Sequence, residues 1–233
     1  MTSAVDLTHL HHLVHLPSRA TALVRYPLSD VSKDPVLLIH GVHSAPGHLS
    51  LWRHKCEAAG LAPYCFSYPT RGTLPEIGDA LAAAVLELHE THKHSVMLVG
   101  HSLGGVLAAL VAVQLSSSHP TAVSEVVAVC SPFDGATLAK ASFLGPSRHV
   151  LQELCHGSDL LTDLRSRLAA DVSGTRWSSL GLLHDGVVTE ASSRLPHPDT
   201  RHVTLSGENH LSVLVSTTVA DTIANILKAE PTA

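Results

Sequence analysis

Aromatic and charged residues are scarce in this 233-residue chain, at 3% and 15% of the total. The lysines and arginines form no cluster and the formal net charge is −5, so a nucleic-acid-binding surface is not expected. No apolar run approaches the length of about 18 residues that a membrane-spanning helix needs. Hydrophobic residues make up 45%, which predicts one large globular domain, residues 1–233, with a sizeable core.

Cysteine is also rare, and its spacing excludes the common metal motifs. The four cysteines, Cys56, Cys65, Cys130 and Cys155, form neither a C-x-x-C pair nor a zinc-type cluster. Cys65 and Cys130 lie in apolar, strand-like segments and are expected to be small buried side chains. We therefore predict no cofactor, no metal and a reducing compartment.

The N-terminus lacks both the basic segment and the continuous apolar segment of a signal peptide, so a cytoplasmic location is expected. Leucines at 7, 10, 13 and 16 form one helical stripe that ends at Pro17. Residues 1–19 are therefore expected to be an N-terminal extension or a short helix packed on the body. Contact with a membrane or lipid surface stays open, although cationic residues are missing there. The 19 histidines are interpreted mainly as surface substitutions without a shared role.

Short apolar runs alternate with amphipathic segments along most of the chain, the pattern of a parallel sheet with helices on both faces. Strands are expected at 20–28, 35–40, 64–68, 96–99, 123–129, 179–183 and 202–205, and helices at 47–59, from 73, after 102 and at 211–227. Thr73 and Glu76 have the spacing of a helix-capping box. The pattern is lost over 133–175, which we interpret as a candidate cap above the sheet.

The most informative segment is Gly100-His101-Ser102-Leu103-Gly104, a G-x-S-x-G sequence. A buried apolar run precedes it and a helical pattern follows it, so Ser102 is expected on a sharp strand-to-helix turn. Side chains two positions either side of such a turn would collide, which explains the glycines at 100 and 104. Ser102 is the candidate nucleophile.

A serine nucleophile needs a histidine base and a carboxylate that orients it. The carboxyl ends of parallel strands share one edge of the sheet. Asp185 follows the strand expected at 179–183, and His210 follows the strand expected at 202–205. The order Ser102, Asp185, His210 is the one expected for this arrangement.

Four other residues are alternatives for the base and the orienting acid. His202 and Asp199 are expected at the opposite end of the sheet, His184 should point away from the site, and Glu208 is too near His210 in sequence to orient it. Two backbone amides are predicted to bind the developing oxyanion. They belong to Leu103, at the start of the helix, and to Val42, which follows His40-Gly41.

Five segments in this order resemble the small serine lipases and esterases of the α/β-hydrolase superfamily, triacylglycerol lipases among them. They are Leu-Ile-His-Gly-Val at 38–42, Gly-His-Ser-Leu-Gly-Gly at 100–105, Ser-Pro-Phe-Asp-Gly-Ala-Thr-Leu-Ala at 131–139, Asp-Gly-Val-Val-Thr at 185–189 and Glu-Asn-His-Leu-Ser at 208–212. The resemblance implies an α/β-hydrolase fold and hydrolysis of small-molecule acyl esters, lipids among them, through an acyl-enzyme on Ser102. Acyl transfer or thioester hydrolysis on the same residues, and a non-catalytic binding protein, remain alternatives.

Overall fold

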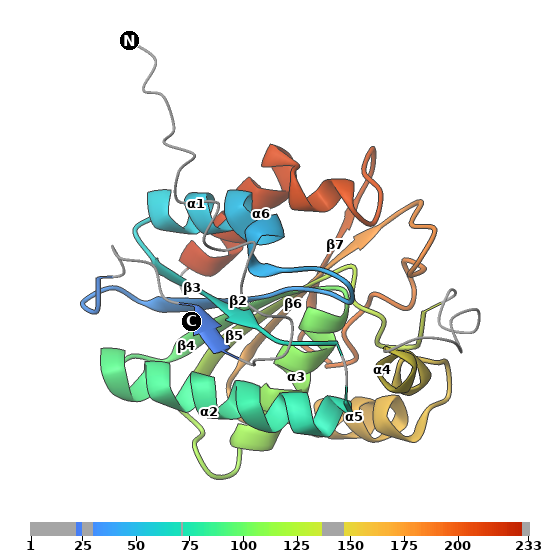
Figure 1. The fold of residues 1–233 in the computed structure, drawn as a ribbon, viewed down its shortest axis with the longest axis horizontal. Coiled ribbons are helices and arrows are strands. Elements are labelled where there is room, and N and C mark those ends of the chain that lie inside the picture. Colours follow the sequence, from blue (N-terminus) through green and yellow to red (C-terminus); the bar gives the residue numbers. More distant parts are fainter. Residues whose placement is uncertain (1–21, 25–29, 71, 137–146, 230–233) are drawn as a thin grey trace.

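The computed structural model describes residues 22–24, 30–70, 72–136 and 147–229. Its centre is a seven-stranded sheet with the order β1-β3-β2-β4-β5-β6-β7 (Figure 1). The strands are β1 (Ala22–Val24), β2 (Pro35–Ile39), β3 (Ala62–Ser67), β4 (Val96–His101), β5 (Val123–Val129), β6 (Arg176–Leu182) and β7 (Arg201–Leu205). Strand β1 pairs antiparallel with β3, and the other pairs are parallel. The predicted fold class is thereby confirmed.

Helices cover both faces of this sheet (Figure 1). One face carries α1 (Ser50–Ala58) and α6 (Thr217–Lys228), which follow 3₁₀ helices at Pro46–Leu49 and Ser212–Leu214. The other carries α2 (Leu74–His92), α3 (Leu103–Leu115) and α5 (Asp159–Ala169), with the short α4 (Arg148–Glu153) beside them. The capping box predicted at Thr73 and Glu76 starts α2.

Each face has its own hydrophobic core, because successive side chains of a strand point to opposite sides. In β4, Leu98 packs in the cluster that contains the apolar sides of α2 and α3. The next residue, Val99, packs in the second cluster, with Trp52 of α1 and Ile223 of α6. The sheet is therefore buried on both sides, and its accessible functional edge is the row of loops at the carboxyl ends of the parallel strands.

The cap expected over 133–175 requires a correction. Leu161, Leu164 and Leu168 of α5 are buried in the same core cluster as α2 and α3. Their three- and four-residue spacing gives α5 one apolar side, which is buried in this cluster beside α3, within the layer of helices that covers this face of the sheet. Helix α5 is thus the crossover between β5 and β6, and the cap prediction is wrong for residues 159–169.

Helix α4 differs from α5 because it adjoins the start of α2. The carboxylate of Glu153 accepts a hydrogen bond of 2.8 Å from the Leu74 amide, and the Thr70 and Ser147 hydroxyls lie 3.0 Å apart. Residues 137–146 and the N-terminal segment 1–19 lie outside the described residues. Within the part of the chain that the structure describes, no helix is both long and apolar enough to cross a membrane.

Candidate active site

Ser102 lies on the predicted sharp turn, between the end of β4 and the first residue of α3. Its backbone has φ 54° and ψ −120°, a conformation that costs roughly 1–3 kcal/mol for a residue with a side chain. A Cβ atom on Gly100 would lie 2.2 Å from the backbone of Gly104, and one on Gly104 would lie 2.2 Å from the carbonyl oxygen of Ile39. The glycines are therefore required, because strand and helix approach each other too closely for any side chain.

Three side chains from separate loops meet at this turn. The Ser102 hydroxyl lies 3.1 Å from Nε2 of His210, and Nδ1 of His210 lies 2.8 Å from a carboxylate oxygen of Asp185. Asp185 follows β6 and His210 follows β7, so both reach Ser102 from the carboxyl edge of the sheet. The structure thus brings together the serine, the histidine and the aspartate selected from the sequence.

Asp185 is held as an anion. Burial opposes its ionisation, but hydrogen bonds from His210 and from the amides of Val187 and Val188 outweigh this effect and keep the pKa of Asp185 below its ordinary value. The two amides donate to the other carboxylate oxygen at 2.7 and 3.1 Å. Because an ionised carboxylate only accepts, Nδ1 of His210 carries the proton and Nε2 is free to accept from Ser102.

The loop that follows β2 passes directly beside Ser102. A Cβ atom on Gly41 would lie 3.1 Å from Cβ of Ser102. Val42 is the next residue, and Leu103 starts α3, where the amides have no acceptor within the helix. Of the two backbone positions predicted for the oxyanion, Leu103 therefore directly follows the serine and Val42 directly follows the glycine that contacts it.

His40 and Tyr68 support this loop. The two rings stack with centroids 4.3 Å apart, and the Tyr68 hydroxyl donates a 2.6 Å hydrogen bond to the His40 carbonyl oxygen. Nδ1 of His40 donates to the Gly41 carbonyl oxygen at 2.9 Å. Burial lowers the pKa of His40 to about 4, so the ring is neutral at physiological pH. We infer that His40 has a supporting role in the site.

His101 supports the base in a similar way. Its Nε2 donates to the His210 carbonyl oxygen at 2.9 Å, and burial, followed by the neighbouring His210, lowers the pKa of His101 to about 3. Nδ1 of this buried ring has no hydrogen-bond partner among the described residues. The hydrogen bond to its carbonyl oxygen therefore holds the backbone of His210 in position.

The four alternatives for the base and the orienting acid either make other contacts or are exposed. His202 contacts the Ser179 hydroxyl at 2.7 Å and the Glu190 carboxylate at 2.9 Å. Glu208 accepts a hydrogen bond from the Ser212 hydroxyl, within its own loop. The side chains of His184 and Asp199 are exposed.

Sequence reasoning missed one neighbour of this site. Cys130 is the first residue after β5 and is buried, as expected, but its thiol adjoins Asp185 and His210. Its backbone has φ 51°, which turns the chain at the end of the strand. The available signal was its position, since the residue that follows β5 must lie on the same edge as Ser102.

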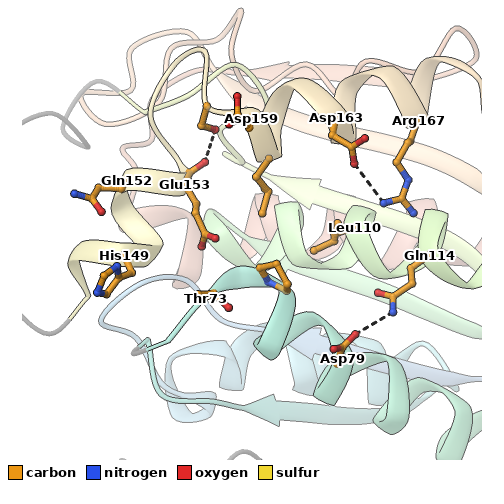
Figure 2. Close-up of a pocket in the computed structure, with 13 residues that line it drawn as sticks. Thr73, Asp79, Leu110, Gln114, His149, Gln152, Glu153, Asp159, Asp163 and Arg167 are labelled. Carbon is orange, nitrogen blue, oxygen red and sulfur yellow. Dashed lines mark hydrogen bonds and ion pairs between the residues drawn. The ribbon is translucent and has the colours of Figure 1, made fainter.

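A separate hollow of about 750 Å³ lies between α2, α3, α4 and α5 (Figure 2). Ser102, Asp185 and His210 do not line it. Its walls carry Asp79, Glu153 and Asp163, and Figure 2 shows Asp163 paired with Arg167. Because none of the three side chains that meet at Ser102 lines it, we do not assign this hollow to the site at Ser102.

Known proteins identify the family of this chain and share its fold. A family model described as the alpha/beta hydrolase family matches residues 36–227. The mature lipase BlEst2 of Bacillus licheniformis superimposes with a TM-score of 0.72 and 17% identity, covering 90% of this chain and 98% of that one. For Aspergillus fumigatus lipase B the TM-score is 0.74 and the identity 15%, covering 89% of this chain and 56% of that one.

A monoacylglycerol lipase of Paleococcus ferrophilus is similar as well, with a TM-score of 0.63 and 17% identity, covering 89% of this chain and 96% of that one. At these identities the likeness shows the fold alone. A search of curated proteins found no match.

Proposed function

Because this chain belongs to the alpha/beta hydrolase family, we propose that it is a serine hydrolase that cleaves carboxylic esters. The observation that supports this most strongly is the chain of contacts from Ser102 through His210 to Asp185, 3.1 and 2.8 Å long. This arrangement provides a nucleophile, a base and an orienting anion in the order that acyl transfer requires.

In the proposed reaction, Ser102 Oγ attacks the ester carbonyl carbon while His210 Nε2 takes its proton. The carbonyl electron pair moves to oxygen, and the amides of Val42 and Leu103 bind this oxyanion. When the carbonyl re-forms, the alcohol leaves with the proton from His210, and an acyl-enzyme remains on Ser102. His210 then deprotonates a water molecule, whose attack releases the acid and the free serine. Asp185 stabilises the imidazolium in both halves of the cycle.

The proposed substrates are esters of acyl chains, including those of lipids. Two observations support this class. The similar folds include two lipases and a monoacylglycerol lipase. The chain is also rich in aliphatic residues and has only 3% aromatics, which favours an acyl pocket over one for planar rings.

The test is a panel of p-nitrophenyl esters from acetate to palmitate, together with triglycerides, for the wild type and Ser102→Ala. We expect the variant to lose at least about a thousandfold in kcat. Ser117→Ala, which changes an exposed serine just beyond α3, should keep full activity. Full activity in a folded Ser102→Ala variant contradicts the proposal. Product formation that rises when an acceptor alcohol or a thioester is supplied would instead indicate acyl transfer or thioester hydrolysis.

A further inference from the structure

A buried thiol adjoins the Asp185–His210 pair and has no part in ester hydrolysis. The sulfur of Cys130, a carboxylate oxygen of Asp185 and a ring nitrogen of His210 all lie within 4.8 Å of one another. We propose that these three side chains form a Zn²⁺ site and that Zn²⁺ bound there switches the hydrolase off.

The donor set suits zinc. Zinc prefers thiolate sulfur, imidazole nitrogen and carboxylate oxygen in a tetrahedral arrangement, with three protein ligands when a fourth position is left to water. Metal–ligand distances of about 2.0–2.3 Å place the ligand atoms about 3.3–3.8 Å apart. The three atoms, which lie within 4.8 Å of one another, therefore have to approach by roughly 1 Å to reach this geometry. Mg²⁺ prefers six oxygen ligands and does not match this set.

The surrounding backbone already orients these ligands. The carboxylate oxygen of Asp185 that does not contact His210 is held by the amides of Val187 and Val188. The Cys130 amide donates to the Leu180 carbonyl oxygen at 2.8 Å, which fixes the residue that carries the thiol. Such contacts behind the ligands strengthen metal binding because less order has to be created on binding. The ligands come from three loops, which explains why no zinc motif is visible in the sequence.

Binding exchanges protons for the metal. Without metal the thiol is protonated, since burial and then the neighbouring Asp185 raise the pKa of Cys130. Zn²⁺ displaces the thiol proton, which passes to solvent, and the single proton of the neutral His210 ring moves from Nδ1 to Nε2 by exchange with water. The thiolate and the carboxylate together balance the two charges of the metal.

Coordination through Nδ1 also accounts for inhibition. The neutral ring then carries its one proton on Nε2, which faces the Ser102 hydroxyl at 3.1 Å. An Nε2 that holds a proton cannot accept the one from serine, so the base is lost until the metal leaves. The inhibitory effect rests on the proposed hydrolase function, whereas metal binding itself does not.

Binding is tested with Co²⁺, which replaces zinc and is visible by absorption spectroscopy. We expect the wild type to show a sulfur-to-cobalt charge-transfer band and tetrahedral visible bands that Zn²⁺ removes. Cys155→Ser, which changes the half-buried cysteine, should keep these bands, whereas Cys130→Ser and Cys130→Ala should lack the charge-transfer band. Absence of this band in the wild type overturns the proposal without any variant. A band that persists in a folded Cys130→Ser protein also overturns it.

Inhibition is tested on the same proteins with p-nitrophenyl butyrate. We expect Zn²⁺, but not Mg²⁺, to inhibit the wild type, EDTA to restore activity, and Cys130→Ser to need at least tenfold more Zn²⁺. Equal inhibition of the wild type and Cys130→Ser would assign the effect to other histidines and contradict the proposal. If the chain proves not to hydrolyse esters, the cobalt spectra still decide whether the metal site exists.

Discussion

Asp185→Asn probes how the carboxylate orients the base. In the wild type the ionised side chain accepts from Nδ1 of His210 at 2.8 Å and from the amides of Val187 and Val188. Asparagine has nearly the same shape, and its carbonyl oxygen can keep the two amide contacts. Its amide group must then face the histidine, and an amide NH₂ donates, so Nδ1 becomes the acceptor and the proton moves to Nε2.

This change disables the base without removing any triad atom from its place. We expect a fall of about 10⁴ in kcat, which corresponds to about 5 kcal/mol in the activation barrier. KM and the urea midpoint should change little, because substrate contacts and the amide hydrogen bonds remain.

The assay is steady-state hydrolysis of p-nitrophenyl butyrate at neutral pH, with Asp199→Asn as the control for loss of an exposed carboxylate. The control should keep wild-type kcat. A folded Asp185→Asn variant that loses less than tenfold in kcat refutes the assigned role of Asp185.

Three further predictions concern stability and the loops around the site. Gly100→Ala should lower the unfolding free energy by about 3 kcal/mol in urea titrations, because its Cβ would lie 2.2 Å from the following helix backbone, whereas Gly47→Ala meets no atom within 4 Å and should be neutral. His101, with a folded pKa of about 3 against about 6.5 unfolded, contributes stability that is complete above pH 6.5 and is lost as pH falls towards 3. His101→Gln should therefore remove about 1.4 kcal/mol per pH unit from the slope of unfolding free energy between pH 6 and 5, measured by urea titrations at each pH. Tyr68→Phe deletes the 2.6 Å hydrogen bond to the His40 carbonyl oxygen, in the loop that follows β2. It should lower kcat about tenfold with little change in KM, as steady-state kinetics would measure.

Much of this architecture could be predicted from the sequence because local patterns determine it. The apolar run before Ser102 and the two glycines around it require a strand, a tight turn and a helix, and the structure contains all three. Once the strands are placed in a parallel sheet, Asp185 and His210 must lie on the same edge as the serine. The chain order of the three residues was therefore enough to select them.

The position of α5 and the contact of Cys130 depend on tertiary packing, so no local sequence pattern predicts them. The leucines of α5 have a helical spacing that suits a cap and a sheet-facing helix equally well, and only their burial in the core separates the two. The thiol of Cys130 meets Asp185 because the ends of β5 and β6 are adjacent in the sheet and because Cys130 has a positive φ. Neither the strand order nor that φ is encoded in a motif.

The most direct test of the central claim is the residue that reacts with a fluorophosphonate. Such a probe forms a stable bond with a serine that a histidine base activates. Intact-protein mass and peptide mapping should show a single adduct on Ser102, absent in Ser102→Ala and greatly slowed in Asp185→Asn. A folded wild-type protein that fails to react, or that is labelled on another residue, contradicts the account.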